Sequence, residues 1–194
     1  MADAAGVRYA EVPVHPTLSP YVQLIWTLDV DLPASFGAAE RIVPDGIVEA
    51  IFHYRTPFNM RYGLAPFSRQ PTSLVVSQTR SFIEIEPAGA SGFISVRFHP
   101  WGACHFFQPP VSAFANQMVT AADLWDKEAV ILEERIATAN STRERVRAVE
   151  RFDRAALAIS EGLGGVVDSP MPRELWPRPC DDTVPGHWGV RAQP

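Results

Sequence analysis

Residues 21–30 alternate between apolar and polar side chains with a period of two, the pattern of a β-strand that buries one face. The apolar residues at every second position are Val22, Leu24, Trp26, Leu28 and Val30. The intervening positions hold Gln23, Thr27 and Asp29, with Ile25 as the apolar exception. Because successive side chains of a strand point to opposite faces, the segment predicts a half-buried strand within a sheet.

A second local signal is the turn Pro44-Asp45-Gly46. Proline presets φ for the first corner of a turn, aspartate tolerates the second, and glycine accepts a positive φ. Ile42 and Val43 precede the turn, and residues 47–54 follow it with mostly apolar and aromatic side chains. This combination predicts a β-hairpin.

Weaker strands are predicted at residues 73–79 and 82–86, and a glycine-bearing corner at 88–92 leads into a strand at 93–98. Proline and glycine are concentrated in the connections. Roughly six strands with connections of varied length favour an antiparallel β-barrel or sandwich over a βαβ fold.

After Pro100 the apolar spacing changes to that of helices. Residues 125–139 and 146–163 carry apolar side chains three and four positions apart. Between them, Ser141 and Glu144 match a capping box, in which the two side chains satisfy backbone N–H groups. The fold class that follows is α+β, with an antiparallel barrel or sandwich followed by a helical pair.

These patterns divide the chain into three parts. We expect the barrel at residues 7–108, a helical dimerisation or linker region at 109–166, and a proline-rich tail at 167–194. The tail has no usable periodicity and is expected to be disordered. The apolar stripe of the second helix is a candidate dimer surface, and the alternative is that it packs on the barrel of its own chain.

Charge and composition narrow the function classes. The sequence has 17 basic and 22 acidic residues and a net charge of −5, whereas DNA-binding domains usually carry a concentrated positive face. No signal-peptide pattern is present, and no apolar stretch reaches the roughly 18 residues that span a bilayer. Cys104 and Cys180 lie far apart and suggest no disulfide framework, with Cys104 expected to be a buried thiol. We expect a soluble, cytoplasmic protein without a membrane partner.

No motif for catalysis or metal binding stands out. A cupin-type metal site typically needs two histidines two positions apart, but the positions two away from His53 hold Ile51 and Arg55. Glu84 and Glu86 share one face of a strand, which is more typical of a solvated face than of acid–base chemistry. We therefore predict no catalytic residues, no metal ligands and no cofactor.

The barrel interior is the remaining candidate for a binding site, because strands supply aromatic walls and a few polar anchors. The candidate ligand-binding residues are Trp26, His53, Tyr54, Arg97 and His99. In the last strand, Phe93, Ser95, Arg97 and His99 share one face, opposite Ile94, Val96 and Phe98. The alternative is that the second set forms the core, while Arg97 lies on the surface or in an ion pair.

Five segments together resemble a known family. In order they are Leu18-Ser-Pro-Tyr-Val22 running into Trp26, Val43-Pro-Asp-Gly46 leading to Glu49-Ala-Ile-Phe52, Val96-Arg-Phe-His-Pro-Trp-Gly102, residues 119–125, and Glu150-Arg-Phe152. Over residues 8–155 the chain resembles the N-terminal region, a domain of unknown function, of a group of AraC-family transcription regulators. That family commonly has a glycine within 75–77 and Pro-Gly-Gly at 100–102, where this chain departs from the pattern.

The resemblance implies a cupin-like β-barrel followed by helices that mediate dimerisation, with a small-molecule effector bound in or near the barrel. Such regulators continue into a pair of helix-turn-helix units, whereas this sequence runs into its proline-rich tail. We therefore expect a non-enzymatic, homodimeric sensor domain that reaches DNA only through a helix-turn-helix domain absent from this chain. A natural truncation, a disrupted reading frame and a trimmed product stay open as explanations.

Two other interpretations stay open. In the first, the chain is a small cupin-type enzyme or small-molecule-binding protein. Metal analysis of the purified protein would help to distinguish such an enzyme from a sensor domain. Alternatively, it regulates by forming unproductive heterodimers with a full-length relative.

Overall fold

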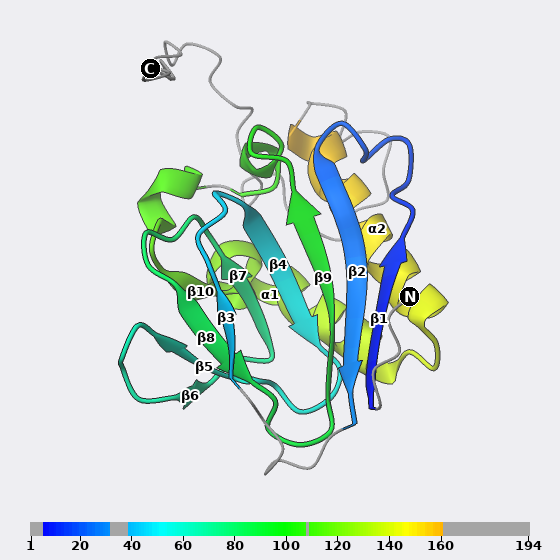
Figure 1. Ribbon diagram of the computed structural model, residues 1–194. Coiled ribbons are helices and arrows are strands. Elements are labelled where there is room, and N and C mark those ends of the chain that lie inside the picture. Colours follow the sequence, from blue (N-terminus) through cyan, green and yellow to red (C-terminus); the bar gives the residue numbers. More distant parts are fainter. Residues whose placement is uncertain (1–5, 32–38, 108, 161–194) are drawn as a thin grey trace, which may run out of the picture.

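Two antiparallel β-sheets face each other in the computed structural model, which describes residues 6–31, 39–107 and 109–160 (Figure 1). The larger sheet has the order β1 (Val7–Val12), β2 (Val22–Val30), β9 (Ser91–Phe98), β4 (Val48–His53), β7 (Ser73–Val76) and β10 (Met118–Thr120). The smaller sheet has the order β3 (Glu40–Ile42), β8 (Ile83–Glu86), β5 (Asn59–Tyr62) and β6 (Ser68–Arg69). The expected tail at 167–194 lies outside the described residues.

The strand order is that of a jelly roll. Along the chain, β2, β4, β7 and β9 of the larger sheet alternate with β3, the β5–β6 pair and β8 of the smaller one. In the larger sheet β9 lies between β2 and β4, and in the smaller sheet β8 lies between β3 and β5. This double Greek-key arrangement is the architecture to which cupins belong. The expected fold class, α+β with a cupin-like antiparallel sandwich followed by two helices, is confirmed.

The hairpin prediction at residues 44–46 was wrong. β3 pairs with β8 in the smaller sheet, and β4 pairs with β7 and β9 in the larger sheet, so the two strands flanking the turn do not pair. Gly46 does adopt the positive φ expected of it, at 74°. The turn therefore has the predicted chemistry, but it carries the chain from one sheet to the other.

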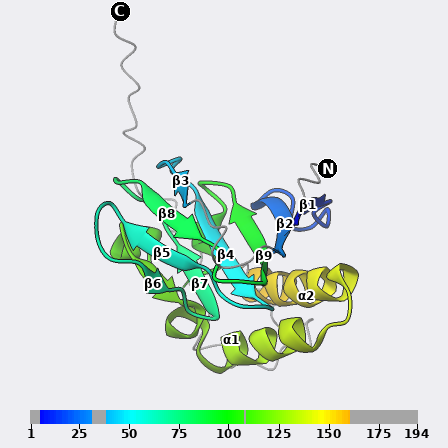
Figure 2. The ribbon, with the colours of Figure 1, turned by 60° about the horizontal axis from the view of Figure 1, so that its bottom comes forward.

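Both faces of the larger sheet are covered. Helices α1 (Ala121–Thr138) and α2 (Thr142–Ser160) lie against its outer face, and the smaller sheet lies against its inner face (Figure 2). In β9, Ile94, Val96 and Phe98 belong to the core on the helix side, whereas Phe93 belongs to the core between the sheets. The alternation predicted for this strand is confirmed.

Strand β2 follows the same alternation with one correction. Trp26 and Leu28 pack with the core between the sheets, and Ile25, the apolar exception in the sequence, is buried on the helix side. Val22 also lies in the helix-side core, because the pairing of β2 with β9 shifts register between Val22 and Leu24. A bulge of this kind moves a side chain to the other face.

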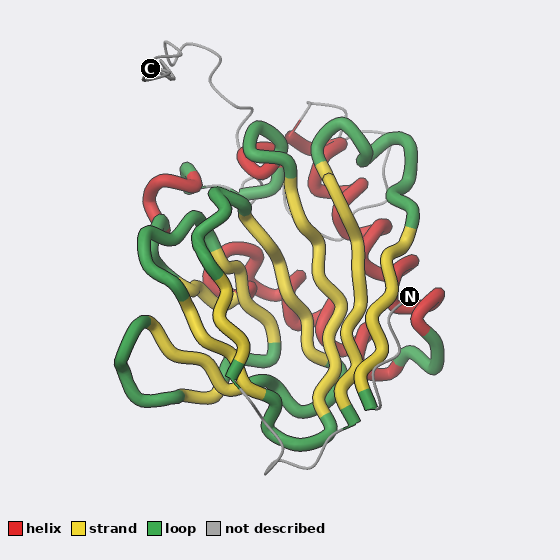
Figure 3. Tube along the Cα trace, viewed as in Figure 1, coloured by secondary structure: helices red, strands yellow, loops and turns green. Residues whose placement is uncertain are grey.

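The helices begin at side-chain caps. At the start of α1, Thr120 and Asp123 form a capping box that the sequence reasoning missed. At the predicted second cap, the Glu144 N–H donates to Ser141 Oγ at 3.3 Å, but the Glu144 carboxylate accepts from the N–H of Asn140 rather than that of Ser141. β10 pairs with β7 and so extends the larger sheet. Figure 3 shows the helices behind the strands of this sheet.

The apolar stripe of α2 is buried within its own chain. Val146, Val149, Ala156 and Leu157 are at most 6% exposed and belong to the core shared with α1 and the larger sheet. Of the two partners considered for this stripe, the structure places it on the barrel and the neighbouring helix. The stripe therefore gives no support to a dimer surface. Within the described ranges, no helix combines the length and apolarity needed to cross a membrane.

Candidate ligand cavity between the sheets

A cavity of about 90 Å³ lies between the two sheets. Most of its wall is aliphatic or aromatic, contributed by strands of both sheets and by the turn between β3 and β4. The lining residues are Trp26, Ile42, Val43, Asp45, Ile47, Glu49, Ile51, Phe58, Gln70, Val76, Ser77, Thr79, Ile83, Ile85, Phe93 and Arg97. An apolar wall with a few polar groups is typical of a small-molecule site.

The polar groups gather at one end around Glu49. Glu49 and Arg97 are directly opposite each other in the β4–β9 pair. The Arg97 Nε–H donates to Glu49 Oε1 at 2.7 Å, and the indole N–H of Trp26 donates to the same oxygen at 3.2 Å. A guanidinium nitrogen of Arg97 also lies 3.4 Å from Asp45 Oδ2. One carboxylate thus holds both predicted residues, Trp26 and Arg97, at the cavity wall.

This polar end is charged and partly shielded from solvent. The side chains of Arg97 and Glu49 are 30% and 17% exposed. Burial alone would lower the pKa of Arg97, but the carboxylates of Glu49 and Asp45 outweigh it, so the pKa lies above its ordinary value. Arg97 is therefore both a cavity residue and an ion-paired residue, which combines the two interpretations that the sequence left open.

The turn between β3 and β4 covers part of the cavity. Val43, Asp45 and Ile47 line the cavity from this turn. Asp45 Oδ1 accepts the Ile47 N–H at 3.1 Å, so one oxygen of Asp45 closes the turn while the other faces Arg97. The turn is mostly exposed to solvent, with Val43 at 65%.

His53 lies between the sheets, beside the cavity. It is 3% exposed, packs on Phe58 and Phe93, and places Nε2 3.1 Å from Oε1 of Gln70, which lines the cavity. Its Nδ1 has no hydrogen-bond partner among the described residues. Burial lowers the pKa of His53 to about 4, against a smaller opposite effect of Gln70. The imidazole is thus a neutral group that contacts Gln70 and helps to hold its side chain at the cavity wall.

Tyr54 and His99 lie away from the cavity. Each follows the last residue of its strand, so the alternation no longer determines its direction. The Tyr54 ring faces α2, where the guanidinium carbon of Arg145 lies 3.9 Å from the ring centroid. His99 stacks on Trp101 with ring centroids 4.7 Å apart. Of the five predicted residues, Trp26 and Arg97 line the cavity and His53 adjoins it. Tyr54 and His99 do neither. Whether any of them binds a ligand stays a prediction.

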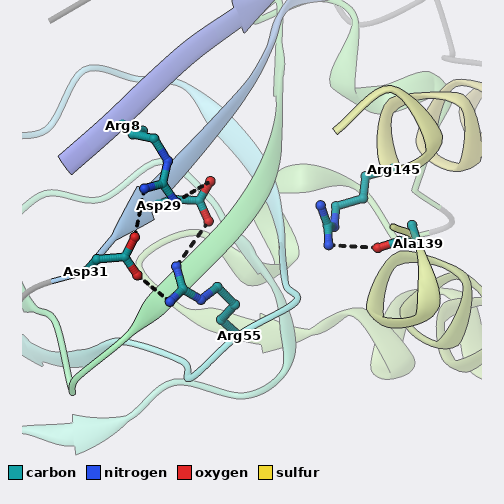
Figure 4. Close-up of polar contacts among 6 residues, drawn as sticks. All are labelled: Arg8, Asp29, Asp31, Arg55, Ala139 and Arg145. Atoms are coloured by element: carbon teal, nitrogen blue, oxygen red, sulfur yellow. Dashed lines mark hydrogen bonds and ion pairs between the residues drawn. The ribbon is translucent and has the colours of Figure 1, made fainter. Parts of the chain in front are cut away.

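Arg8, Asp29, Asp31 and Arg55 form an ion cluster near the start of β1 and the end of β2 (Figure 4). Arg8 donates to Asp31 at 2.8 Å, and Arg55 contacts both Asp31 and Asp29. The guanidinium groups of Arg55 and then Arg8 hold the pKa of Asp31 below its usual value. The cluster joins the ends of neighbouring strands. Because its side chains are 20–57% exposed, its contribution to the stability of the fold is modest.

Glu49 and Asp45 were not among the binding residues predicted from the sequence. Glu49 shares a strand face with Ile51 and His53, opposite Val48, Ala50 and Phe52, so the period of two placed it on the inner face. Its pairing with Arg97 depends on the register of β4 against β9. That register is a long-range property that the sequence pattern of one strand does not reveal.

Donor side chains for a cupin-type metal are not assembled in the described part of the chain. No group of three His, Cys, Asp or Glu side chains there is placed to hold a metal ion. His53 is surrounded by Gln70 and phenylalanine rings, and Glu84 faces away from the cavity, paired with Arg41 and Arg61. The residues present therefore do not fit such a metal.

Cys104 differs from the sequence-based expectation of a buried, unreactive thiol. It is half-buried rather than buried, so that expectation was wrong.

Residues 10–120, more than half of the chain, match the model of a family described as a domain of unknown function (DUF6597). No curated protein matches the sequence. The family match ends at the last residue of β10 and so covers nearly the whole of the two sheets, including the cavity.

Several solved structures match part of this chain with low similarity. KdgF from Halomonas sp. has a TM-score of 0.37 and 10% identity over 52% of this chain and 84% of that chain. Hydroxypropylphosphonic acid epoxidase from S. wedmorenis has a TM-score of 0.37 and 16% identity over 48% and 51%, so the match spans about half of that protein. The EutQ protein of Clostridium difficile has a TM-score of 0.37 and 10% identity over 50% and 66%. These values carry no information on ligand or activity, and the fold assignment rests on the strand order.

Proposed function

This chain belongs to the DUF6597 family, and on that premise we propose that it is the effector-sensing part of an AraC-type transcription regulator. In this proposal a small molecule binds in the cavity between the sheets, and the domain carries out no chemical reaction. It is cytoplasmic and homodimeric, and it acts on DNA only through a helix-turn-helix domain elsewhere.

The observation that carries the sensing role is the cavity with its single polar end. Its wall comes from both sheets, while Glu49 fixes Arg97 and Trp26 in position by two hydrogen bonds to one oxygen. Pre-positioned polar groups in an otherwise apolar pocket favour binding and orientation of an organic ligand.

The link to AraC-type regulators is supported by the segments that carry the resemblance. The Pro44-Asp45-Gly46 turn lies at the cavity, where Asp45 contacts Arg97. Arg97 itself belongs to the Arg-Phe-x-Pro-x-Gly segment, which ends at Gly102. Two of the most specific segments of the resemblance thus meet at the same polar end of the cavity.

Strand β4 is the proposed connection between ligand and helices. Its inner face carries Glu49 at the cavity. Its outer face carries Phe52, which stacks on Trp125 of α1 with ring centroids 6.4 Å apart. A ligand that displaces Glu49 would therefore act on a strand that also supports α1, and we propose that this shift changes how the helices present the rest of the regulator.

The sensing proposal is tested with a library of small organic molecules against the full chain, using chemical-shift changes in nitrogen-15 NMR. Arg97→Ala and Trp26→Ala are expected to weaken binding of every molecule that contacts the cavity. The matched controls are Arg143→Ala and Trp101→Ala, which remove exposed side chains and are expected to leave binding unchanged. The proposal fails if the two cavity variants bind every ligand as the wild-type chain does.

The homodimer is a separate part of the proposal and has its own test. Sedimentation analysis of the full chain at several concentrations is expected to give the mass of two chains. A monomeric mass throughout would remove dimerisation from the proposal without affecting the cavity. The chain alone is expected to give no shift of a promoter fragment in a gel.

A small cupin-type enzyme is the second candidate, and one observation favours it. Glu49 is a half-buried carboxylate at a cavity within a jelly roll, and such a group is suited to accept a proton from a bound substrate. Metal analysis of the purified protein separates the two candidates in part. Stoichiometric iron, manganese or zinc would favour the enzyme, despite the scattered donors.

A further inference from the structure

We propose that the ligand of this cavity is a small, uncharged molecule with a short apolar body and a hydroxyl or amide end. This inference rests on the proposed function, because it assumes that the cavity is a binding site, and it adds the chemical class of the ligand. It follows from the charge balance, the unused hydrogen-bonding atoms and the size of the cavity.

The charge balance at the polar end disfavours anions. One guanidinium, Arg97, faces two carboxylates, Glu49 and Asp45, at 2.7 and 3.4 Å. A ligand carboxylate or phosphate that paired with Arg97 would either be repelled by these two carboxylates or have to displace one of them. Either is costly at a site that is partly shielded from water.

The surroundings of Trp26 add to the negative charge. The Tyr9 ring lies 5.4 Å from the Trp26 ring, and its hydroxyl donates to Glu11 at 2.6 Å. Burial and the bond to Glu11 raise the pKa of Tyr9 to about 12, so the phenol is neutral near pH 7. Glu11, an exposed carboxylate opposite Trp26 in the β1–β2 pair, therefore adds negative charge near Trp26.

Two atoms at the polar end have unused hydrogen-bonding capacity. Glu49 Oε1 accepts two hydrogen bonds, whereas no described residue donates to Glu49 Oε2. Similarly, Arg97 uses Nε and Nη2, and no described residue accepts from its Nη1. A hydroxyl or primary amide can both donate to a carboxylate oxygen and accept from a guanidinium N–H, so it is a chemical match for these two atoms.

An ammonium group fits less well than a neutral donor. It would be attracted by Glu49, but it would lie beside the Arg97 guanidinium. It would also lose its hydration on entering a wall that is mostly apolar, and an ionised group loses far more on desolvation than a hydroxyl does. The geometry thus selects a group that both donates and accepts and carries no charge.

The remaining cavity sets the size of the apolar body. Aliphatic and aromatic side chains such as Ile51, Phe58 and Ile83 line it from both sheets. Its volume of about 90 Å³ is smaller than the roughly 150 Å³ of an engineered apolar cavity that binds benzene. The structure therefore accommodates a short branched alkyl group more readily than a ring.

The test compares three molecules with the same branched alkyl body and different ends, namely isoamyl alcohol, isoamylamine and isovalerate. Binding to the full chain is followed by the indole N–H resonance of Trp26, which is assigned with Trp26→Phe. The expected result is that isoamyl alcohol binds at least about tenfold more tightly than the amine or the carboxylate.

Charge variants test the cause. Glu49→Gln removes one carboxylate and is expected to tighten isovalerate binding by at least about tenfold, with a smaller effect on the alcohol. If Glu49→Gln does not fold, Asp45→Asn, in the exposed turn, replaces it in the test. This variant is also expected to tighten isovalerate binding. Glu86→Gln is the matched control, because it removes a charge that faces away from the cavity and bonds to Asn59.

Several outcomes would overturn this inference. Equal or tighter binding of isovalerate or isoamylamine by the wild-type chain contradicts the ligand class but leaves the cavity as a binding site. If none of the three binds but other molecules of the library bind at the cavity, the ligand class is likewise contradicted and the cavity stays a binding site. If no molecule binds there at all, the proposed function itself fails.

Discussion

The guanidinium carbon of Arg145 in α2 lies 3.9 Å from the centroid of the Tyr54 ring, just past the end of β4. The same side chain donates from Nη2 to the carbonyl oxygen of Ala139 at 2.8 Å, in the turn between α1 and α2 (Figure 4). Arg145 thus joins the helical hairpin to the sheet that carries the cavity.

Replacing Arg145 is expected to loosen this attachment. Arg145→Met keeps an apolar stem but loses the contact with Tyr54 and the hydrogen bond to Ala139, so we expect the free energy of unfolding to fall by about 1–3 kcal/mol. Urea denaturation of the wild type and the variant measures this change in the free energy of unfolding. Arg143→Met, at an exposed position of the same helix, is the control and is expected to change stability by less than about 0.5 kcal/mol. Equal effects of the two variants would contradict the role of Arg145.

Gly102 is expected to tolerate no side chain. A Cβ placed on Gly102 would lie 2.1 Å from the carbonyl oxygen of Tyr21, which already accepts the N–H of His99 at 2.8 Å. Because the obstacle is backbone, Gly102→Ala must separate two segments of the chain, and we expect a loss of at least about 2 kcal/mol in the free energy of unfolding. Thermal denaturation followed by circular dichroism measures the change.

The control for Gly102 is Gly46→Asn. An added Cβ at Gly46 meets nothing within 4 Å, and asparagine tolerates the positive φ of 74° at this position. We expect the midpoint of unfolding to change little. A loss at Gly102 no larger than that at Gly46 would show that the approach to Tyr21 does not constrain the fold.

Much of the fold could be predicted because it depends on local periodicity. The alternation in β2 and β9 identified strands, and the change of spacing after Pro100 identified the helices. The hairpin at residues 44–46 failed for a different reason. Turn chemistry determines backbone angles at three residues, whereas the sheet that each flanking strand joins depends on contacts with β8 and β9, far away in the sequence.

The candidate site was predicted only in part for the same reason. Trp26 and Arg97 were found because each lies within a regular strand, where alternation gives the face. Tyr54 and His99 were misplaced because they follow strand ends, where the chain changes direction. Glu49 has a polar side chain in an apolar strand, a signal that was present, but its role depends on lying opposite Arg97.

The buried His53 is expected to make stability depend on pH between about 4 and 6.5. Burial lowers its pKa to about 4, so between these values the unfolded chain binds a proton that the folded chain does not. Stability contributed by the neutral imidazole is present above pH 6.5 and is lost as the pH falls. Between pH 7 and pH 5 this group alone should reduce the free energy of unfolding by about 2 kcal/mol.

The measurement is urea denaturation of wild type and His53→Leu at pH 7 and pH 5. The variant is expected to lose about 2 kcal/mol less than the wild type over this range, whatever its stability at pH 7. His99→Leu is the control, since His99 lies beyond the strand end and stacks on Trp101. If His53→Leu shows the same pH dependence as the wild type, the imidazole is not neutral in the folded chain for the reason given.

Asp153 of α2 is expected to act in the opposite direction. It is 3% exposed, its Oδ2 has no hydrogen-bond partner among the described residues, and burial together with the charge of Glu150 raises the pKa of its carboxyl well above the ordinary value. The folded chain therefore holds a proton that the unfolded chain releases, so stability is lost as the pH rises through the folded pKa. Asp153→Asn removes this loss, and we expect it to raise the free energy of unfolding at pH 8 by at least about 1 kcal/mol while changing it little at pH 4. Glu134→Gln, an exposed carboxylate of α1, should show no such difference between the two pH values. A stabilisation by Asp153→Asn that is equal at pH 4 and pH 8 would mean that packing, and not ionisation, explains it.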